Sequence, residues 1–248
     1  MRNDLVLERC PVNWNCDFKR RECPIPKFVE FEVPPKPKPT NNSTKKYPMI
    51  HTHVTYAPHH TNKNIGQAYN DFVEMVPDDD WICFLDHDAM FTTDDWYKQL
   101  EEIAGMIESK PDLQKQIGLL TVLTNRIGNV EQIIFRKDSE EAKNHDMYFH
   151  RRWGRSQQKF HRGSLQKATN LISGIVMLFP KRVWIQTAGF KDGFLGVDND
   201  FDKQVRELGY GTYIMKGVYV YHWYRAAPKP GELQGWGYPV STNLPPIK

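Results

Sequence analysis

The chain has 248 residues, of which 40% are hydrophobic and 25% charged, as in an ordinary soluble globular protein with a sizeable core. Its net charge of +3 is too small to imply a nucleic-acid partner by itself. It contains no run of about 18 apolar residues, and its start lacks the apolar segment of a signal peptide. We therefore expect no membrane span and a cytoplasmic protein.

Composition divides the chain into three parts. Residues 1–46 are expected to form an N-terminal extension, because they include the proline-rich run 34–39, an extended linker. A compact domain is expected over residues 47–225, and the proline- and glycine-rich residues 226–248 are expected to form an irregular tail.

The first half of the compact domain alternates strand and helix patterns. Apolar runs and helical spacing predict a strand at 49–56, a helix at 64–75, a strand at 81–85, a helix at 96–107 and a strand at 117–123. We read Thr92 to Asp95 as a capping box for the second helix.

The second half continues this alternation after a less regular stretch, residues 128–168. The patterns predict a strand at 171–179, a short helix at 181–188, a helix running up to Gly209 and a strand at 212–221. Strands that alternate with helices predict an α/β fold with a mostly parallel central sheet flanked by helices. Ligands of such sheets collect at the carboxyl ends of the strands.

Asp86 and Asp88 follow directly after the buried strand 81–85. Residues two apart on an extended chain point the same way, so the two carboxylates are expected to lie together. They would repel each other unless a cation lay between them. The pattern therefore indicates a divalent cation with oxygen ligands, Mn²⁺ or Mg²⁺, although a polar turn after a strand gives the same short pattern.

Asn64 and Gly66 open the helix that follows the first strand. Asn64 is a plausible N-cap, and Gly66 would allow close approach of a ligand or of another backbone segment. A strand, a polar loop and a helix N-terminus form a geometry that suits a phosphate. Capping alone would also explain both residues.

A basic run with interleaved aromatic residues lies between residues 150 and 167 and includes Arg151, Arg152, Trp153 and Arg155. It is either a solvated, charged loop or a surface that contacts phosphates and stacks on bases. The second interpretation would make these four residues an acceptor-binding surface.

The order of the motifs resembles that of a GT-A glycosyltransferase of the family-2 type. The resemblance covers about residues 47–225 and rests on residues 64–70, on Asp86 to Asp88, on residues 189–200 and on the apolar strand that ends in His222. Compact phage-encoded enzymes of this kind are the closest in appearance, which would place the protein in the host cytoplasm.

The resemblance implies a GT-A (Rossmann-like) fold and a role for each motif. Asp86, Asp88 and His222 would hold Mn²⁺ or Mg²⁺ on the diphosphate of a nucleotide-sugar, expected to be a UDP-sugar. Asp198 would be the general base of an inverting transfer, and Asp200 would contact the acceptor.

The donor would also be bound by further residues near the strand ends, namely Tyr56, Asn64, Gly66, Asn70 and Asn125. The acceptor could be a hydroxymethylated base in DNA, which would have to leave the stack, or a glycan.

Two departures from the family pattern keep other functions open. Val197 stands where the family usually has an acid, and one clear strand precedes Asn64, so the nucleotide half is short. A catalytically inactive nucleotide- or nucleic-acid-binding module on the same scaffold is one alternative. A nucleotidyltransferase is another, although no glycine- and lysine-rich triphosphate loop is present.

Overall fold

The computed structural model describes residues 48–55, 64–136 and 139–223. The expected extension, the expected tail and Tyr56 lie outside the described residues. The strands are β1 (Ile50–Val54), β2 (Trp81–Leu85), β3 (Ala89–Phe91), β4 (Ile117–Thr124), β5 (Leu165–Lys167), β6 (Val176–Pro180) and β7 (Gly211–His222). The helices are α1 (Ile65–Met75), α2 (Trp96–Glu108), α3 (Pro111–Gln116), the 3₁₀ helix η2 (Val130–Gln132), α4 (Glu140–Lys143), α5 (Met147–His161), α6 (Lys181–Trp184) and α7 (Val197–Glu207).

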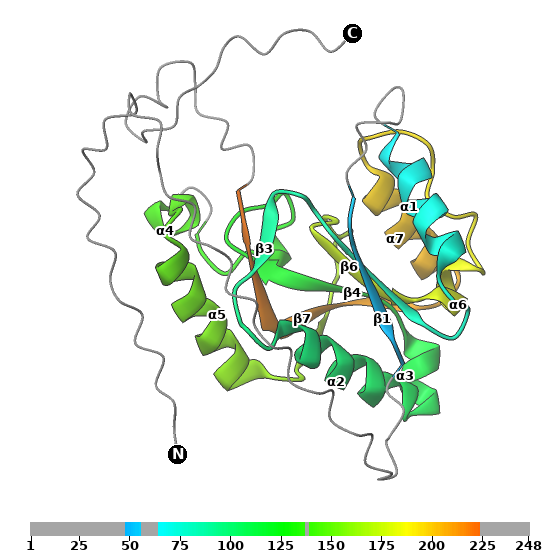
Figure 1. Ribbon diagram of the computed structural model, residues 1–248, viewed down its shortest axis with the longest axis horizontal. Coiled ribbons are helices and arrows are strands. Elements are labelled where there is room, and N and C mark those ends of the chain that lie inside the picture. Colours follow the sequence, from blue (N-terminus) through cyan, green and yellow to red (C-terminus); the bar gives the residue numbers. More distant parts are fainter. Residues whose placement is uncertain (1–47, 56–63, 137–138, 224–248) are drawn as a thin grey trace, which may run out of the picture. The chain divides into compact units, whose positions relative to one another are not determined.

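These strands form one sheet in the order β1-β2-β6-β4-β7-β3, with β5 also paired to β7 (Figure 1). The pairs β1/β2 and β4/β7 are parallel, whereas β2/β6, β4/β6, β3/β7 and β5/β7 are antiparallel. The prediction of an α/β fold with helices flanking a central sheet is confirmed, but the prediction of a mostly parallel sheet is wrong. An apolar run such as β6 shows burial on both faces and carries no information about its direction.

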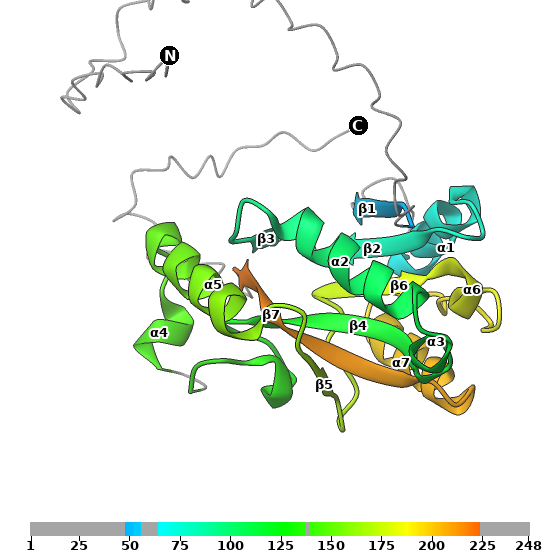
Figure 2. The same ribbon diagram turned by 90° about the horizontal axis from the view of Figure 1, so that it is seen from below.

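Successive residues of each strand point to opposite faces of the sheet and pack into two hydrophobic cores, one on each face. On β2, Trp81 and Cys83 pack with helix α2, whereas Ile82 and Phe84 pack with α1 and α7. In both views α1, α6 and α7 lie together, apart from α2 (Figures 1 and 2). Within the described ranges, no helix combines the length and the apolar character needed to cross a bilayer.

The strand expected at 171–179 is shorter in the structure and begins only at Val176. Residues 172–174 give their backbone hydrogen bonds to side chains instead of to a neighbouring strand. The apolar pattern predicted burial correctly, but side chains far along the chain decide the hydrogen bonding here.

Helix α5 falls in the stretch that we expected to be less regular. Its fully buried positions are His150 and Gly154, and its apolar residues Phe149 and Trp153 are only half-buried, so few apolar residues mark the inner face of the helix. His150 instead pairs with the Tyr219 hydroxyl at 2.7 Å and the Asn144 carbonyl at 2.8 Å. A carbonyl only accepts, so Nε2 donates to Asn144 and Nδ1 accepts from Tyr219.

The capping box expected at Thr92 to Asp95 does not form. Helix α2 begins after Asp95, which makes no side-chain capping bond, and the Thr92 hydroxyl donates to the Tyr219 carbonyl. The helix expected at 96–107 is present, and its residues Leu100, Ile103 and Ile107 are buried.

Candidate active site

A cavity of about 380 Å³ opens at the end of the sheet where β2 and β7 finish. Its volume is in the range of small-molecule sites. Its lining residues come from segments far apart in the sequence and are Ile65, Tyr69, Asp86, His87, Asp88, Ile127, Gly128, Ser173, Gly174, Phe194, Leu195, Gly196, Val197, Asp198 and His222. Three carboxylates and two imidazoles therefore face one space.

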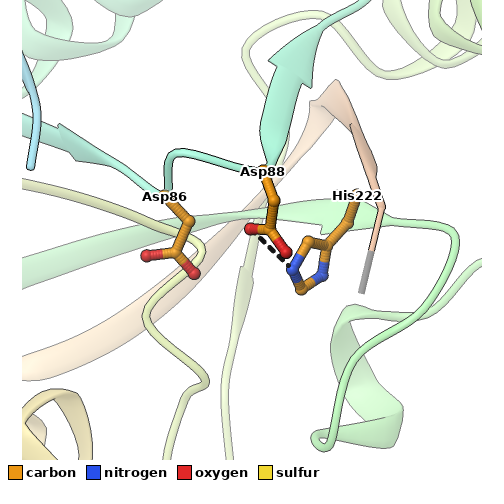
Figure 3. Close-up of side chains that lie close together, drawn as sticks. All are labelled: Asp86, Asp88 and His222. Carbon is orange, nitrogen blue, oxygen red and sulfur yellow. Dashed lines mark ion pairs between the residues drawn. The ribbon is translucent and has the colours of Figure 1, made fainter. Parts of the chain in front are cut away.

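Asp86 directly follows β2, Asp88 directly precedes β3, and His222 is the last residue of β7. Strand β3 pairs with β7 so that Ala89 lies opposite His222, which brings Asp88 next to the imidazole. Figure 3 shows the two carboxylates on the same side of the β2–β3 connection, with the His222 ring beside Asp88. His222 Nε2 lies 3.3 Å from Asp88 Oδ1.

The orientation of the His222 ring is fixed by hydrogen bonds on its other side. Its Nδ1 lies 2.8 Å from the carbonyl oxygen of Arg126, which can only accept, so Nδ1 carries the proton. Nε2 is therefore the nitrogen directed at Asp88, and its contact with that carboxylate requires a proton on Nε2 or a cation between the two groups. Histidines that bind metal typically donate the N–H of their other ring nitrogen to a carbonyl or carboxylate in this way.

Asn125 holds the backbone of the same residue. The N–H of His222 donates to Asn125 Oδ1 at 2.7 Å, and Asn125 Nδ2 donates to the carbonyls of His222 and Ala142. Asn125 is completely buried and does not line the cavity. We expected Asn125 to bind the nucleotide-sugar, but in the structure its amide positions His222.

The two carboxylates differ in their pKa. The pKa of Asp86 is raised to about 7, mainly by burial; the charge of His222 acts to lower it, and the charges of Asp88 and Asp198 act to raise it. Burial also acts to raise the pKa of Asp88, but the hydrogen bond and charge of His222, with the charge of His87, hold it below its usual value. A cation between these groups would remove the repulsion that Asp86 experiences.

Asp198 lies in the first turn of α7 and lines the same cavity. Its Oδ2 accepts a hydrogen bond of 2.6 Å from the backbone N–H of Gly174, which leaves Oδ1 available to a ligand. A Cβ atom at Gly174 would lie 2.6 Å from the Cβ of Asp198, so only glycine allows this approach. Gly174 is a glycine inside an apolar run, a weak signal in the sequence, because such a glycine often marks close contact with another segment.

The other two aspartates of α7 do not line the cavity. The carboxylate of Asp200 accepts from Gln204 at 2.8 Å, and Asp200 does not line the cavity. Asp202 is fully buried, forms an ion pair with Arg206 at 2.9 Å and accepts from the N–H of Ile172 at 2.8 Å. Of the three aspartates, Asp198 alone faces the cavity.

The residues that open α1 contact protein backbone. Asn64 caps α1 through Gln67 N at 3.0 Å, as predicted, and the same Oδ1 accepts from Gly193 N at 2.9 Å. A Cβ atom on Gly66 would lie 1.9 Å from the Lys191 carbonyl oxygen, so the close approach at Gly66 is to this loop. The side chain of Asn70 also binds this loop, at Phe190.

The residues expected to bind the acceptor lie on α5. Arg151, Arg152 and Arg155 are exposed, and none of the three lines the cavity. The Trp153 ring is half-buried and packs edge-on against Phe135, with ring centroids 5.1 Å apart. In this structure Trp153 is therefore a packing residue and is not presented for stacking on a base.

In a comparison with protein families, residues 39–105 match the model of Glycosyl transferase family 2. The matched segment includes β1, α1, β2 and both Asp86 and Asp88. The chain is a nucleotide-sugar-dependent glycosyltransferase. No match was found among curated proteins.

The donor set of this glycosyltransferase fits a divalent cation. Asp86, Asp88 and His222 each offer one ligand atom, and these atoms lie within 4.8 Å of one another. Carboxylate oxygens suit Mg²⁺ and Mn²⁺, and an imidazole nitrogen favours Mn²⁺ over Mg²⁺. In the glycosyltransferase these three residues are the group that would hold the cation.

Proposed function

We propose that this glycosyltransferase transfers a sugar from a UDP-sugar to an acceptor hydroxyl with inversion at the anomeric carbon. One observation carries the proposal: a single cavity contains the Asp86, Asp88 and His222 set together with the unpaired oxygen of Asp198. The first group suits a diphosphate with its cation, and the second suits the removal of a proton.

The donor half rests on Asp86, Asp88 and His222. These residues would hold Mn²⁺ or Mg²⁺, which when bound neutralises the charge that develops on the leaving diphosphate. The hydrogen bond from His222 Nδ1 to Arg126 keeps Nε2 aimed into the site. The side chain of Asn125 hydrogen-bonds to both backbone groups of His222 and so holds the end of β7 in position.

The acceptor half rests on Asp198. Its Oδ1 accepts the proton of the acceptor hydroxyl while the hydroxyl oxygen forms a bond to the anomeric carbon and the bond from that carbon to the diphosphate oxygen breaks. Asp198 ends protonated and the nucleotide leaves as the diphosphate. Its place in the first turn of α7 favours a negative charge.

One candidate acceptor is a hydroxymethylated base in DNA. The exposed Arg151, Arg152 and Arg155 support it, because arginines neutralise phosphates. Transfer to a glycan is the other candidate. The described residues of the cavity lining include three carboxylates and no lysine or arginine, which favours a glycan over a phosphate-rich acceptor.

The experiment is a thermal-denaturation series of the full chain with UDP, GDP, ADP and their glucose conjugates, each with and without Mn²⁺. A ligand at 100 times its Kd adds about 2.7 kcal/mol to the free energy of unfolding. We expect stabilisation by the uridine nucleotides that depends on Mn²⁺. Stabilisation of equal size in EDTA would contradict the proposed metal site, and stabilisation by another nucleotide alone would contradict the UDP donor.

A further inference from the structure

Two large apolar side chains stand exposed at the rim of the cavity. Phe194 is 57% exposed and Leu195 is 79% exposed, and both line the cavity that contains Asp198. Single exposed apolar residues are common on protein surfaces, but an adjacent pair at the rim of a catalytic cavity is available to a ligand.

The loop that carries this pair is held in place by α1. The Gly193 carbonyl accepts from the N–H groups of Ile65 and Gly66 at 2.9 and 3.3 Å, and the N–H of Gly193 donates to Asn64 at 2.9 Å. Gly193 and Gly196 flank the pair with φ of 122° and 69°, conformations that other residues rarely adopt. The backbone thus directs Phe194 and Leu195 outward in a defined position.

The charge of the cavity restricts what this pair can bind. Among the described residues, the lining contains Asp86, Asp88 and Asp198 but no lysine or arginine, and the nearby Lys191 ammonium lies beside Gly196 without lining the cavity. The cation expected at Asp86 and Asp88 would be occupied by the diphosphate of the donor. A phosphate-bearing acceptor would therefore meet a carboxylate at Asp198 without a compensating positive charge in the lining.

We propose that Phe194 and Leu195 bind the apolar part of an uncharged acceptor, a glycoside with an aromatic or alkyl aglycone, and so select the acceptor. This inference rests on the proposed function, because it takes Asp198 as the group that faces the acceptor hydroxyl. Phe194, Leu195 and Asp198 line the same cavity, so an aglycone bound on the pair keeps the attached sugar within the space that the Asp198 carboxylate faces. Binding of the aglycone would be driven by the hydrophobic effect, because it removes apolar surface of the aglycone and of both side chains from water.

The test is saturation-transfer NMR of the full chain with UDP and Mg²⁺, a readout that needs no turnover. The probes are the phenyl and methyl glycosides of glucose, galactose and N-acetylglucosamine. The wild type should saturate the phenyl protons, and the phenyl glycoside should bind about tenfold more tightly than the methyl glycoside of the same sugar. Phe194→Ser and Leu195→Ser should each remove most of this preference.

Leu208→Ser is the matched control, because Leu208 is also exposed, at 42%, and does not line the cavity. It should keep the wild-type preference. Equal binding of phenyl and methyl glycosides by the wild type, or an unchanged preference in both loop variants, would overturn the inference. The inference would also be overturned if UDP with Mg²⁺ no longer stabilised these variants against unfolding, because Phe194 and Leu195 would then bind the donor.

The proposed function is tested separately by release of UDP from UDP-sugars. If the wild type binds the phenyl glycosides through Phe194 and Leu195 but releases no UDP, the proposed function fails and the binding site stands. If UDP is released at the same rate with every glycoside and in every variant, the function stands and the inference fails.

Discussion

The side-chain amide of Asn70 binds both backbone groups of Phe190. The N–H of Phe190 donates to Asn70 Oδ1 at 2.8 Å, and Asn70 Nδ2 donates to the Phe190 carbonyl at 2.8 Å. This pair ties α1 to the loop that leads to Asp198. A residue that we expected to contact the nucleotide-sugar thus fixes the loop that continues into the proposed base.

Replacing Asn70 by aspartate keeps the shape but removes the donor, so the Phe190 carbonyl would face a carboxylate. We expect the free energy of unfolding to fall by about 1 to 3 kcal/mol, the usual effect of an unpaired buried polar group. Turnover should fall while UDP–Mn²⁺ binding remains. Urea denaturation and UDP release measure the two effects.

Glu74→Gln is the control for this variant, because Glu74 is exposed on the same helix, whereas the two hydrogen bonds to the Phe190 backbone come from Asn70. It should match the wild type in both measurements. Wild-type stability and turnover in Asn70→Asp would show that the pair has no such role.

Gly174→Ala should impair Asp198 directly. The added methyl group would lie 2.6 Å from the Asp198 Cβ, so the carboxylate or the backbone must move. We expect kcat to fall at least about tenfold, since small misplacements of reacting groups are costly. Gly128→Ala is the control on the same cavity, because its methyl group would meet Ser173 Oγ at an ordinary 3.5 Å. Equal kcat for the two variants would contradict the proposed position of Asp198.

Asp86→Asn should stabilise the protein when no metal is bound. The pKa of Asp86 is raised to about 7, so the folded protein holds a proton that the unfolded chain has lost between about pH 4 and 7. Stability from this group therefore falls as the pH rises through that window. In EDTA at pH 8 we expect the variant to be more stable by on the order of 1 to 3 kcal/mol, and the difference should vanish near pH 4.

Saturating Mn²⁺ should reverse that order, because the cation binds the wild-type carboxylate and stabilises the folded state. Melting curves at pH 4 and 8, in EDTA and in Mn²⁺, test both statements. The raised pKa would be refuted if, in EDTA, the difference in stability between Asp86→Asn and the wild type were the same at pH 4 and pH 8.

The donor half of the site could be predicted because its information is local. The apolar run of β2 and the spacing of Asp86 and Asp88 are both contained in a few residues, and the predicted strand end is confirmed. Asn64 as the N-cap of α1 is confirmed for the same reason. His222 required the resemblance to a known family, since nothing near it in the sequence indicates a ligand.

The rest depends on contacts between distant residues. The direction of β6, the bonds between Asp198 and Gly174 and the clamp of Asn70 on Phe190 join segments separated by tens of residues. Helix α5 was missed because its buried residues, His150 and Gly154, are not apolar in the helical pattern. Propensity and periodicity describe one segment at a time and contain none of these relationships.

Asp88→Ala should abolish the effect of Mn²⁺ on UDP binding, because it removes a ligand and the partner of His222. Asp80→Ala is the matched control, since it breaks another aspartate–histidine pair, with His51 at 2.9 Å, away from the cavity. We expect a loss of at least about 2 kcal/mol of Mn²⁺-dependent stabilisation in Asp88→Ala alone. Equal responses in the two variants would place the metal elsewhere.

The most direct test of the central claim is Mn²⁺-dependent release of UDP from UDP-sugars by the wild type, Asp198→Asn and Asp200→Asn. Asparagine at position 198 keeps an acceptor for the Gly174 N–H but cannot take a proton. The account predicts that Asp198→Asn lowers acceptor-dependent release by about 10²- to 10⁴-fold, whereas Asp200→Asn stays within a few-fold of the wild type. Undiminished release by Asp198→Asn, or no release by the wild type while it still binds UDP with Mn²⁺, would contradict it, and the second result would favour a binding module.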